Sequence, residues 1–521
     1  MPGGGNDGAR LAAFGSRLAH TWPEDGRPWQ VVDGTLGFFD VSGYTRLTER
    51  LARLGAEGAE AITEIADALF VGLISAAFAH GGDVLQFSGD AVLIHFTGDD
   101  HEHRAALAAR AMQAFIGREG SIATEIGRVR LRMSVGMHAG PATFARLGEG
   151  QHVVLALGEH ISRALAAEKE AAATQVLVTP ETAARLPAAW GRPTPSGMVR
   201  LVRVPLDPGG PLDAAILRPT VADEVARGWV PGPVRDLLAA GVIPGEHRQL
   251  SLAFIGARDL DRRLERDGAD ATVARLQQLA VEIERAQAEY DLLWVGADAL
   301  PGAADFVLVA GSPTAHEDDE DRLLTACREI LDAGIDLDLV VGVNRGRNFT
   351  GDVGHPWRRT YSISGDATNL AARIMAHAEP GQLLVHAPVL DRVRGRVRTA
   401  PIAPFHAKGK AAPVETVDLE GIRSTREVAE ALTTPMLGRD DALHMVGAAI
   451  ASGGTAEVTG PAGVGKTRLV EEALAAAGAP VVRVTAEPFA RSRPLAAARR
   501  LLRRSVGIDD DADAGAAVAQ W

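Results

Sequence analysis

The sequence predicts an α+β protein in which one domain of strands and helices occurs twice, followed by the start of an α/β unit. Three observations lead to this prediction. The order of strand and helix patterns in the first 200 residues returns after residue 248, and a proline- and glycine-rich segment separates the two copies. A glycine-rich motif then opens a third unit. At 521 residues the chain is also too long for one compact core.

The first copy contains alternating strand and helix patterns. Its predicted elements are, in order, a strand in LGFFDVSGY at 36–44, a strand pair in GGDVLQFSGDAVLIHF at 81–96, a helix at 104–115, a strand at 131–142 and a helix that opens at 158. The two strands of the pair are joined by a turn at 88–90.

The second copy repeats this order. Its predicted elements are a strand at 250–256, a hairpin at 291–311, a helix that contains Cys327, a strand at 337–348 and a helix that opens at 365. The spacing between Gly136 and Gly342 is almost the same as that between Gly158 and Gly365. A divergent tandem repeat follows from these matches.

Composition shifts divide the chain into segments. We predict an N-terminal extension at 1–28, the first copy at 29–216, a linker at 217–247, the second copy at 248–420, a second linker at 421–434 and the third unit at 435–521.

Charge and composition exclude several classes of protein. The net charge of −13 argues against non-specific binding of nucleic acid or anionic membranes, because both need a basic surface. Cys327 is the only cysteine, which excludes an internal disulfide and a cysteine zinc cluster. The N-terminus lacks the pattern of a signal peptide, and the longest apolar stretch is about half of what a bilayer span needs. We expect a cytoplasmic protein without a membrane span.

Two carboxylates carry the strongest chemical signal in the first copy. Asp40 follows a buried strand in FFDVSGY, and Asp90 lies in the turn of FSGDAV. Either aspartate alone would be interpreted as a turn residue that binds backbone amides. Together, at one sheet edge, they offer the hard oxygen ligands that Mg²⁺ or Mn²⁺ requires.

FFDVSGYTRLTERL and GGDVLQFSGDAVLIHF resemble the two metal-binding signatures of class III adenylyl and guanylyl cyclases, and the resemblance extends over roughly residues 30–420. It implies two ferredoxin-like domains with helices on one face of each sheet, which pair head to tail within the chain as a pseudo-dimer. The tandem arrangement before a P-loop region looks like that of the mammalian-type soluble adenylyl cyclases.

The resemblance assigns roles to the first copy. Asp40 and Asp90 match the aspartates that hold two Mg²⁺ or Mn²⁺ ions, one activating the ribose 3′-hydroxyl and the other binding the triphosphate. Val41 belongs to this metal group. The turn and helix start that follow would present backbone amides to the phosphates, and comprise Ser42, Gly43, Tyr44 and Thr45.

The second copy supplies the complementary groups. In YSISGDATNLAARIM, Asn369 matches the asparagine that orients the ribose, and Arg373 matches the arginine that stabilises charge on the reacting phosphorus. The first copy instead has Ser162 and Ala166 at these positions, and the second copy has Gly256 where a metal aspartate would lie, although Asp305 is near. One composite site can therefore be complete, while its twin cannot catalyse.

The end of the site that reads the base departs from the family pattern. Ser362, with Ile363 beside it, takes the place of the family's aspartate or threonine, but no lysine occurs near Trp294–Gly296. Serine does not decide between adenine and guanine, so ATP is favoured by the overall resemblance alone. Gln86 and Leu165 replace the basic residues of the soluble enzymes' bicarbonate site, and activation by bicarbonate is not expected.

GPAGVGKT at 460–467 fits the P-loop pattern between the strand-like AEVTG and a helical pattern. Its phosphate-binding residues would include Gly460, Gly465, Lys466 and Thr467, with the lysine on the β and γ oxygens and the threonine on Mg²⁺. Too few residues follow for a complete nucleotide-binding sheet, so we expect only the opening part of such a domain.

Three functional hypotheses follow. The first is an adenylate cyclase that converts ATP to 3′,5′-cyclic AMP and pyrophosphate in cyclic-nucleotide signalling. The second is a weak or inactive cyclase-like module that binds nucleotide and regulates the attached ATPase region. The third is a guanylyl cyclase.

Overall fold

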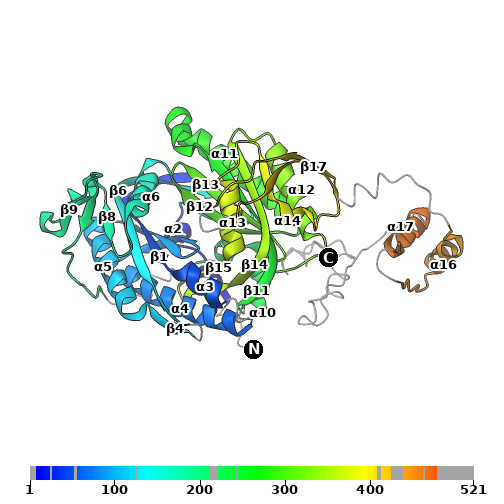
Figure 1. Cartoon of the computed structure of the whole chain (residues 1–521), viewed down its shortest axis with the longest axis horizontal. Coiled ribbons are helices and arrows are strands. Elements are labelled where there is room, and N and C mark those ends of the chain that lie inside the picture. Colours follow the sequence, from blue (N-terminus) through cyan, green and yellow to red (C-terminus); the bar gives the residue numbers. More distant parts are fainter. Residues whose placement is uncertain are drawn as a thin grey trace. The chain divides into compact units, whose positions relative to one another are not determined.

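The structure is a computed structural model of the whole chain. It describes residues 7–23, 26–51, 56–124, 127–210, 221–241, 243, 245–407, 412–423, 438–460 and 464–477. The chain divides into two compact units, Met1–Arg426 and Glu427–Trp521. The larger unit holds two similar sheets, each with eight strands (Figure 1).

The first copy follows two short N-terminal helices, α1 (Asp7–Ala12) and α2 (Arg17–His20). Its elements are β1 (Trp29–Ser42), α3 (Tyr44–Leu51), α4 (Ala56–Ala79), β2 (Asp83–Ser88), β3 (Ala91–Phe96), α5 (His101–Glu119), β4 (Ser121–Thr124), β5 (Gly127–Arg130), β6 (Arg132–Leu147), β7 (Val153–Leu157), α6 (Glu159–Glu170), β8 (Val176–Val178), α7 (Pro180–Ala183), a 3₁₀ helix (Ala188–Trp190), β9 (Gly191–Pro193) and β10 (Val199–Leu201).

The predicted linker at 217–247 contains two helices, α9 (Asp223–Gly228) and α10 (Gly232–Ala240). The second copy then comprises β11 (Glu246–Arg258), α11 (Leu260–Tyr290), β12 (Leu293–Leu300), β13 (Ala303–Ala310), α12 (Asp319–Asp332), β14 (Asp338–His355), β15 (Arg358–Ser364), α13 (Asp366–Met375), β16 (Leu383–His386), α14 (Ala387–Leu390), β17 (Arg396–Pro401) and β18 (Thr416–Arg423).

The two sheets have the same topology. The strand order is β2-β3-β1-β6-β8-β10-β9 in one and β12-β13-β11-β14-β16-β18-β17 in the other, with β7 on β6 and β15 on β14. The central pairings are antiparallel, whereas β6–β8 and β14–β16 are parallel. The two similar sheets confirm a mixed fold with a tandem repeat.

The strand register shows which residues of the two copies correspond. Asp40 lies opposite Ala91 on β3 and Ser134 on β6, whereas Gly256 lies opposite Asp305 on β13 and Val340 on β14. Gly256 is therefore the counterpart of Asp40. Ala304, the residue before Asp305, is the counterpart of Asp90.

The expectation of helices on one face of each sheet is wrong. In the first copy, α4 and α5 pack on the face that carries Phe39 and Val41, while α6 packs on the opposite face. The close approach of α6 depends on Gly136, because a Cβ there would lie 2.0 Å from the backbone nitrogen of Glu168. Gly342 has the same role under α13, which lies along β11 and β14 (Figure 1).

The two copies contact each other through corresponding elements. α4 of the first copy packs on β14 of the second, and α11 of the second packs on β6 of the first. At the latter contact, the carboxylate of Glu284 on α11 accepts hydrogen bonds from the backbone amides of residues 149–151, at 2.6–3.1 Å. At the former, Asp67 on α4 accepts one from the amide of Gly354, at 3.2 Å.

The smaller unit contains α16 (Asp440–Ala451) and α17 (Lys466–Ala477), which pack together through Val446, Leu469 and Ala473. The helix predicted after the glycine-rich motif is present. The strand predicted at 456–460 is wrong, since these residues have no strand structure. A strand needs a hydrogen-bonded neighbour, and the described part of this unit offers none.

Within the described ranges, no helix has both the length and the apolar character needed to cross a bilayer.

The packing of α6 gives a test of the fold. We expect Gly136→Ala to destabilise the larger unit by about 3 kcal/mol, because α6 must move away from β6 to accommodate the methyl group. Gly117→Ala is the matched control: this exposed position on α5 has no atom within 4 Å of an added Cβ, so the same change should stabilise by about 0.5–1 kcal/mol. Calorimetric unfolding of both variants measures the difference, and equal unfolding temperatures would contradict the described contact.

Candidate active site

The backbone brings Asp40 and Asp90 to the same sheet edge. Asp40 lies near the end of β1, and the amide of the next residue, Val41, donates to the carbonyl oxygen of Asp90 at 3.2 Å. Burial, together with the negative charges of Asp90 and Glu168, raises the pKa of Asp40 to about 7, against a hydrogen bond from Ser42. Two half-buried carboxylates that repel each other fit a divalent cation, because such an ion would neutralise their charge.

The described residues contain no cluster of three histidine, cysteine, aspartate or glutamate side chains arranged to hold a metal ion. Any ion at Asp40 and Asp90 would need further oxygen ligands from the backbone or from a substrate phosphate. The side chain of Val41 is only 1% exposed, in the apolar core, so only its backbone atoms could take part.

The turn after β1 leads directly into α3. Gly43 has a φ of +98°, which favours glycine, and α3 begins at Tyr44. Burial and the charges of Asp90 and Asp67 raise the pKa of Tyr44, which lines the same cavity as Asp90. The first backbone amides of α3, which have no partner within the helix, thus lie at the end of β1 that carries Asp40. The side chain of Thr45 lies outside the described part.

A cavity of about 340 Å³ brings residues of the two copies together. The predicted site residues that line it are Tyr44 and Asp90 from the first copy and Ser362, Ile363 and Asn369 from the second. Asp40 and Arg373 do not line it. Arg373 directly follows the lining residue Ala372, and it has no hydrogen bond or ion pair with any described residue.

Other walls of the cavity were not predicted. Phe14, Ser16 and Ala19 of the N-terminal segment line it, as do Trp229 and Pro231 beside α10. Phe14 packs in one apolar cluster with residues of both β11 and β15. No sequence motif connects these segments with the site.

A buried arginine connects the two copies beside this cavity. Arg358 at the start of β15 donates to the carbonyl oxygens of Val84 and Leu85 on β2, at 2.7 and 2.9 Å, and to that of Phe14 at 2.7 Å. Its guanidinium also lies 5.1 Å from the ring centre of Phe87. Burial lowers the pKa of Arg358 to about 10. The strand that leads to Asp90 is therefore fixed against the strand that carries Ser362.

The corresponding place in the second copy is filled by the protein itself. A Cβ on Gly256 would lie 2.5 Å from the guanidinium of Arg258, which pairs with Asp305 at 2.8 Å. A fixed cation thus occupies the place of the Asp40 side chain. Ser162, the counterpart of Asn369, donates to Asp261 at 2.6 Å. Arg258 therefore occupies the position in the second copy that corresponds to the Asp40 side chain. The hydroxyl of Ser162, which corresponds to Asn369, already donates to Asp261.

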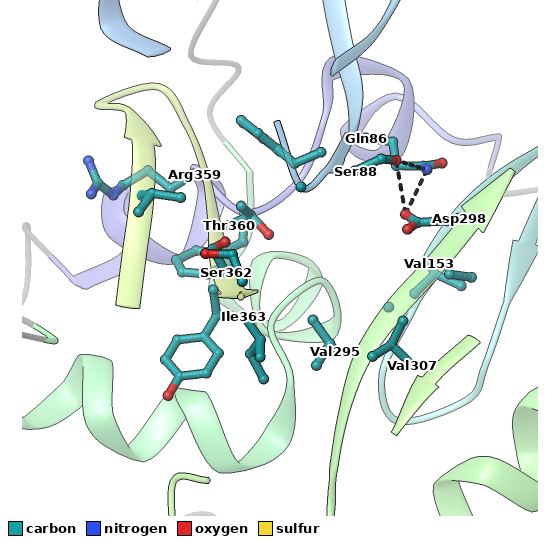
Figure 2. Close-up of a pocket in the computed structure, with 18 of the residues that line it drawn as sticks. Gln86, Ser88, Val153, Val295, Asp298, Val307, Arg359, Thr360, Ser362 and Ile363 are labelled. Carbon is teal, nitrogen blue, oxygen red and sulfur yellow. Dashed lines mark hydrogen bonds between the residues drawn. The ribbon is translucent and has the colours of Figure 1, made fainter. Parts of the chain in front are cut away.

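At Val295 and Gly296, where the sequence lacks the family's lysine, the cavity contains the carboxylate of Asp298. Val295, Gly296 and Asp298 line the cavity, and Gln86 Nε2 donates to Asp298 Oδ1 at 2.7 Å. Ser88 Oγ donates to the same oxygen at 3.2 Å. Figure 2 shows Gln86, Ser88 and Asp298 together, away from Thr360 and Ser362. Burial, together with the negative charge of Asp305, raises the pKa of Asp298 to about 7, against the hydrogen bonds from Ser88 and Gln86.

In the smaller unit, the amino group of Lys466 donates to the carbonyl oxygen of Gly460 at 2.9 Å, and Gly465 precedes α17 with a φ of +89°. The lysine side chain thus reaches back to the first glycine of the motif. Residues 461–463 and the side chain of Thr467 lie outside the described part.

Asp298 gives a prediction of pH dependence. A carboxyl whose folded-state pKa is raised binds its proton more tightly when the chain is folded, so its ionisation destabilises the fold as the pH rises towards and above 7. Asp298→Asn keeps an acceptor for Gln86 but cannot ionise. We expect this variant to unfold at a higher temperature than the unmodified protein at pH 8 and at nearly the same temperature at pH 5. An equal difference at both pH values would contradict the raised pKa.

Comparison with known proteins gives an independent view of the chain. No protein-family model matches it. Adenylate cyclase type 10 of rabbit (Oryctolagus cuniculus) is 27% identical over 153 residues, which are 28% of this chain and 9% of the rabbit protein. The human protein (Homo sapiens) of the same name is 26% identical over 167 residues, 31% of this chain and 10% of the human one. The matches span only about a tenth of these relatives.

A crystal structure of a class III adenylyl cyclase-like ATP-binding protein from Pseudomonas aeruginosa has a TM-score of 0.51 to this chain at 15% identity, and covers 71% of this chain and 88% of that one. At this identity the likeness shows the fold alone. The sequence matches show class III cyclase-like homology in part of this chain, and the shared fold agrees with it.

Proposed function

We propose that the chain is an adenylate cyclase, which converts ATP to 3′,5′-cyclic AMP and pyrophosphate at one composite site between its two copies. The observation that carries this proposal is the cavity on which Asp90 of the first copy and Asn369 of the second both lie. The corresponding metal position of the second copy is filled by Arg258. Only one of the two possible sites therefore retains the required groups.

Asp40 and Asp90 would hold the divalent ions, Mg²⁺ or Mn²⁺. Bound ions would supply charge neutralisation at the triphosphate and activation of the ribose 3′-hydroxyl. The turn Ser42–Thr45 would direct the first backbone amides of α3 at phosphate oxygens, which a helix N-terminus favours. In this arrangement the first copy binds the triphosphate.

The second copy would act on the sugar, the reacting phosphorus and the base. Asn369 offers an amide to the ribose, and Ser362 and Ile363 line the cavity where the base would lie. Arg373, one helical turn after Asn369, keeps its positive charge at any relevant pH and can donate several hydrogen bonds to the phosphate oxygens. Its stabilisation of charge would be larger in the transition state than in bound ATP.

We also propose that the loop around Lys466 binds nucleotide phosphates. The support is the position of its amino group over the loop carbonyl of Gly460, from which a phosphate could displace it. Cytoplasmic location stays a prediction.

A product assay tests the main proposal. Purified chain with Mn²⁺ and either ATP or GTP should form a cyclic nucleotide from ATP, detected by mass spectrometry. Cyclic GMP as the preferred product would favour the guanylyl cyclase. Without a lysine at Val295–Gly296, no residue there selects adenine over guanine. No product from either nucleotide would overturn the enzyme proposal.

Single substitutions test the assigned roles. We expect Arg373→Ala to lower kcat by about 10²–10³-fold, because charge on the reacting phosphorus loses its stabilising group. Asp40→Asn should reduce kcat at least as much. Arg163→Ala is the matched control, since this arginine lies on the corresponding helix α6 and pairs with Glu159 and Glu181. Its kcat should be unchanged, and full activity in either of the first two variants would contradict the site.

The second candidate is a module that binds nucleotide without turnover and regulates the attached ATPase region. The similar protein from Pseudomonas aeruginosa is a cyclase-like, ATP-binding protein, and Asp298 places a carboxylate at the end of the cavity that reads the base. Measurable ATP affinity without cyclic product would favour this candidate.

A further inference from the structure

A third carboxylate lies next to the proposed metal aspartates. Glu168, near the end of α6, accepts a hydrogen bond of 2.9 Å from Ser134 Oγ. Ser134 is 4% exposed and lies directly opposite Asp40 in the β1–β6 register. Because paired residues of neighbouring strands point to the same face of a sheet, Asp40, Ser134 and Glu168 lie on the face that α6 covers.

The three carboxylates affect one another electrostatically. The charge of Glu168 contributes to the raised pKa of Asp40. Burial raises the pKa of Glu168 itself, against the hydrogen bond from Ser134, and the charge of Asp90 adds to that rise. Glu168 therefore lies close enough to Asp40 and Asp90 for its charge to act on both.

The second copy serves as an internal comparison. Its counterparts of Asp40, Asp90 and Ser134 are Gly256, Ala304 and Val340. The counterpart of Glu168 is Met375, because a Cβ on Gly342 would lie 2.1 Å from the Met375 nitrogen, as one on Gly136 lies 2.0 Å from the Glu168 nitrogen. All four polar groups are thus replaced by apolar or smaller residues in the copy without a metal site.

The joint replacement separates two possible roles of Glu168. If the glutamate only anchored α6 to the sheet, the second copy would need an anchor at the same place on α13. Instead that place holds Met375 against Gly342. The hydrogen bonds between α13 and β14 lie in the first turn of α13, where Asn344 donates to the carbonyl oxygen of Ala367 and Thr368 donates to Asn348. Glu168 and Ser134 occur only in the copy that has the two proposed metal aspartates, whereas the packing of the helix on the sheet occurs in both copies.

We propose that Glu168 is an outer carboxylate of the metal site: it does not bind the ion directly, and its negative charge, held in place by Ser134, increases the affinity of Asp40 and Asp90 for a divalent cation. The proposal rests on the metal site of the proposed function. No group of three metal-ligating side chains exists among the described residues, which agrees with a role outside the direct ligands.

The test measures Mn²⁺ binding to the full chain in the absence of nucleotide, by the electron paramagnetic resonance signal of free Mn²⁺. Glu168→Gln keeps the size of the side chain and its acceptor for Ser134, but removes the charge. We expect its dissociation constant for Mn²⁺ to rise about tenfold, because the removed charge attracts the divalent ion. Glu168→Asp, which keeps the charge, should recover most of the affinity.

Glu170→Gln is the matched control. It removes the same charge from the same helix at an exposed position, so the Mn²⁺ affinity should remain that of the unmodified chain. A role of Glu168 through its charge also predicts that the difference caused by Glu168→Gln shrinks at 1 M salt. Without metal, the same variant should unfold at a slightly higher temperature, because a repulsive charge is lost. Lower affinity together with lower metal-free stability would instead indicate structural damage, and would overturn the proposal.

Asp40→Asn separates this proposal from that of the metal site. If Asp40→Asn abolishes Mn²⁺ binding while Glu168→Gln binds like the unmodified chain, the outer carboxylate is wrong and the metal site stands. If neither variant changes Mn²⁺ binding, or if the unmodified chain binds none, both proposals are overturned.

Discussion

The candidate site depends on the contact between β15 of the second copy and β2 of the first, which Arg358 makes. A buried guanidinium is costly unless its donors are satisfied, and here backbone carbonyl oxygens from both copies accept them. Because β2 leads into the turn with Asp90, and β15 leads into α13 with Asn369, this side chain, together with the α4–β14 and α11–β6 contacts, sets the spacing of groups that are far apart in sequence. The cavity is lined by residues of both copies, so its shape depends on this spacing.

The two copies share one topology but differ in which polar groups they keep. On the first copy's α6 face, Asp40, Ser134 and Glu168 form a polar region. The carboxylates of Asp40, Glu168 and Asp90 repel one another in the absence of a cation. In the second copy, Arg258 supplies a permanent cation that pairs with Asp305. The negative charge of Asp305 in the second copy is therefore balanced by Arg258. In the first copy a metal ion would neutralise the negative charges.

Much of this arrangement could be predicted from the sequence. The order of strands and helices follows from hydrophobic periodicity, and the tandem repeat from the spacing of Gly136 and Gly342, because local patterns determine both. The motifs also point to Asp40, Asp90 and Asn369 as candidates. The assignment of these residues to a catalytic site stays a prediction.

Other features depend on contacts that no local pattern encodes. Arg258 reaches the place of Asp40 only because Gly256 has no side chain, and the link between Ser134 and Glu168 follows from strand register and helix packing. The sequence predicts the N-terminal segment only as an extension, although Phe14 lines the cavity. The strand expected at 456–460 is wrong for the opposite reason: its apolar pattern is sufficient locally, but it has no described partner strand.

The central claim is that one chain contributes both halves of one site. It is tested most directly by mixing two inactive variants, Asp40→Asn and Arg373→Ala, and measuring cyclic AMP formation. If the first copy's aspartates act with the second copy's arginine in the same chain, each molecule in the mixture lacks one half, and the rate should not exceed that of either variant alone. Recovery of a substantial fraction of the unmodified activity would show that sites form between chains, and would contradict the claim.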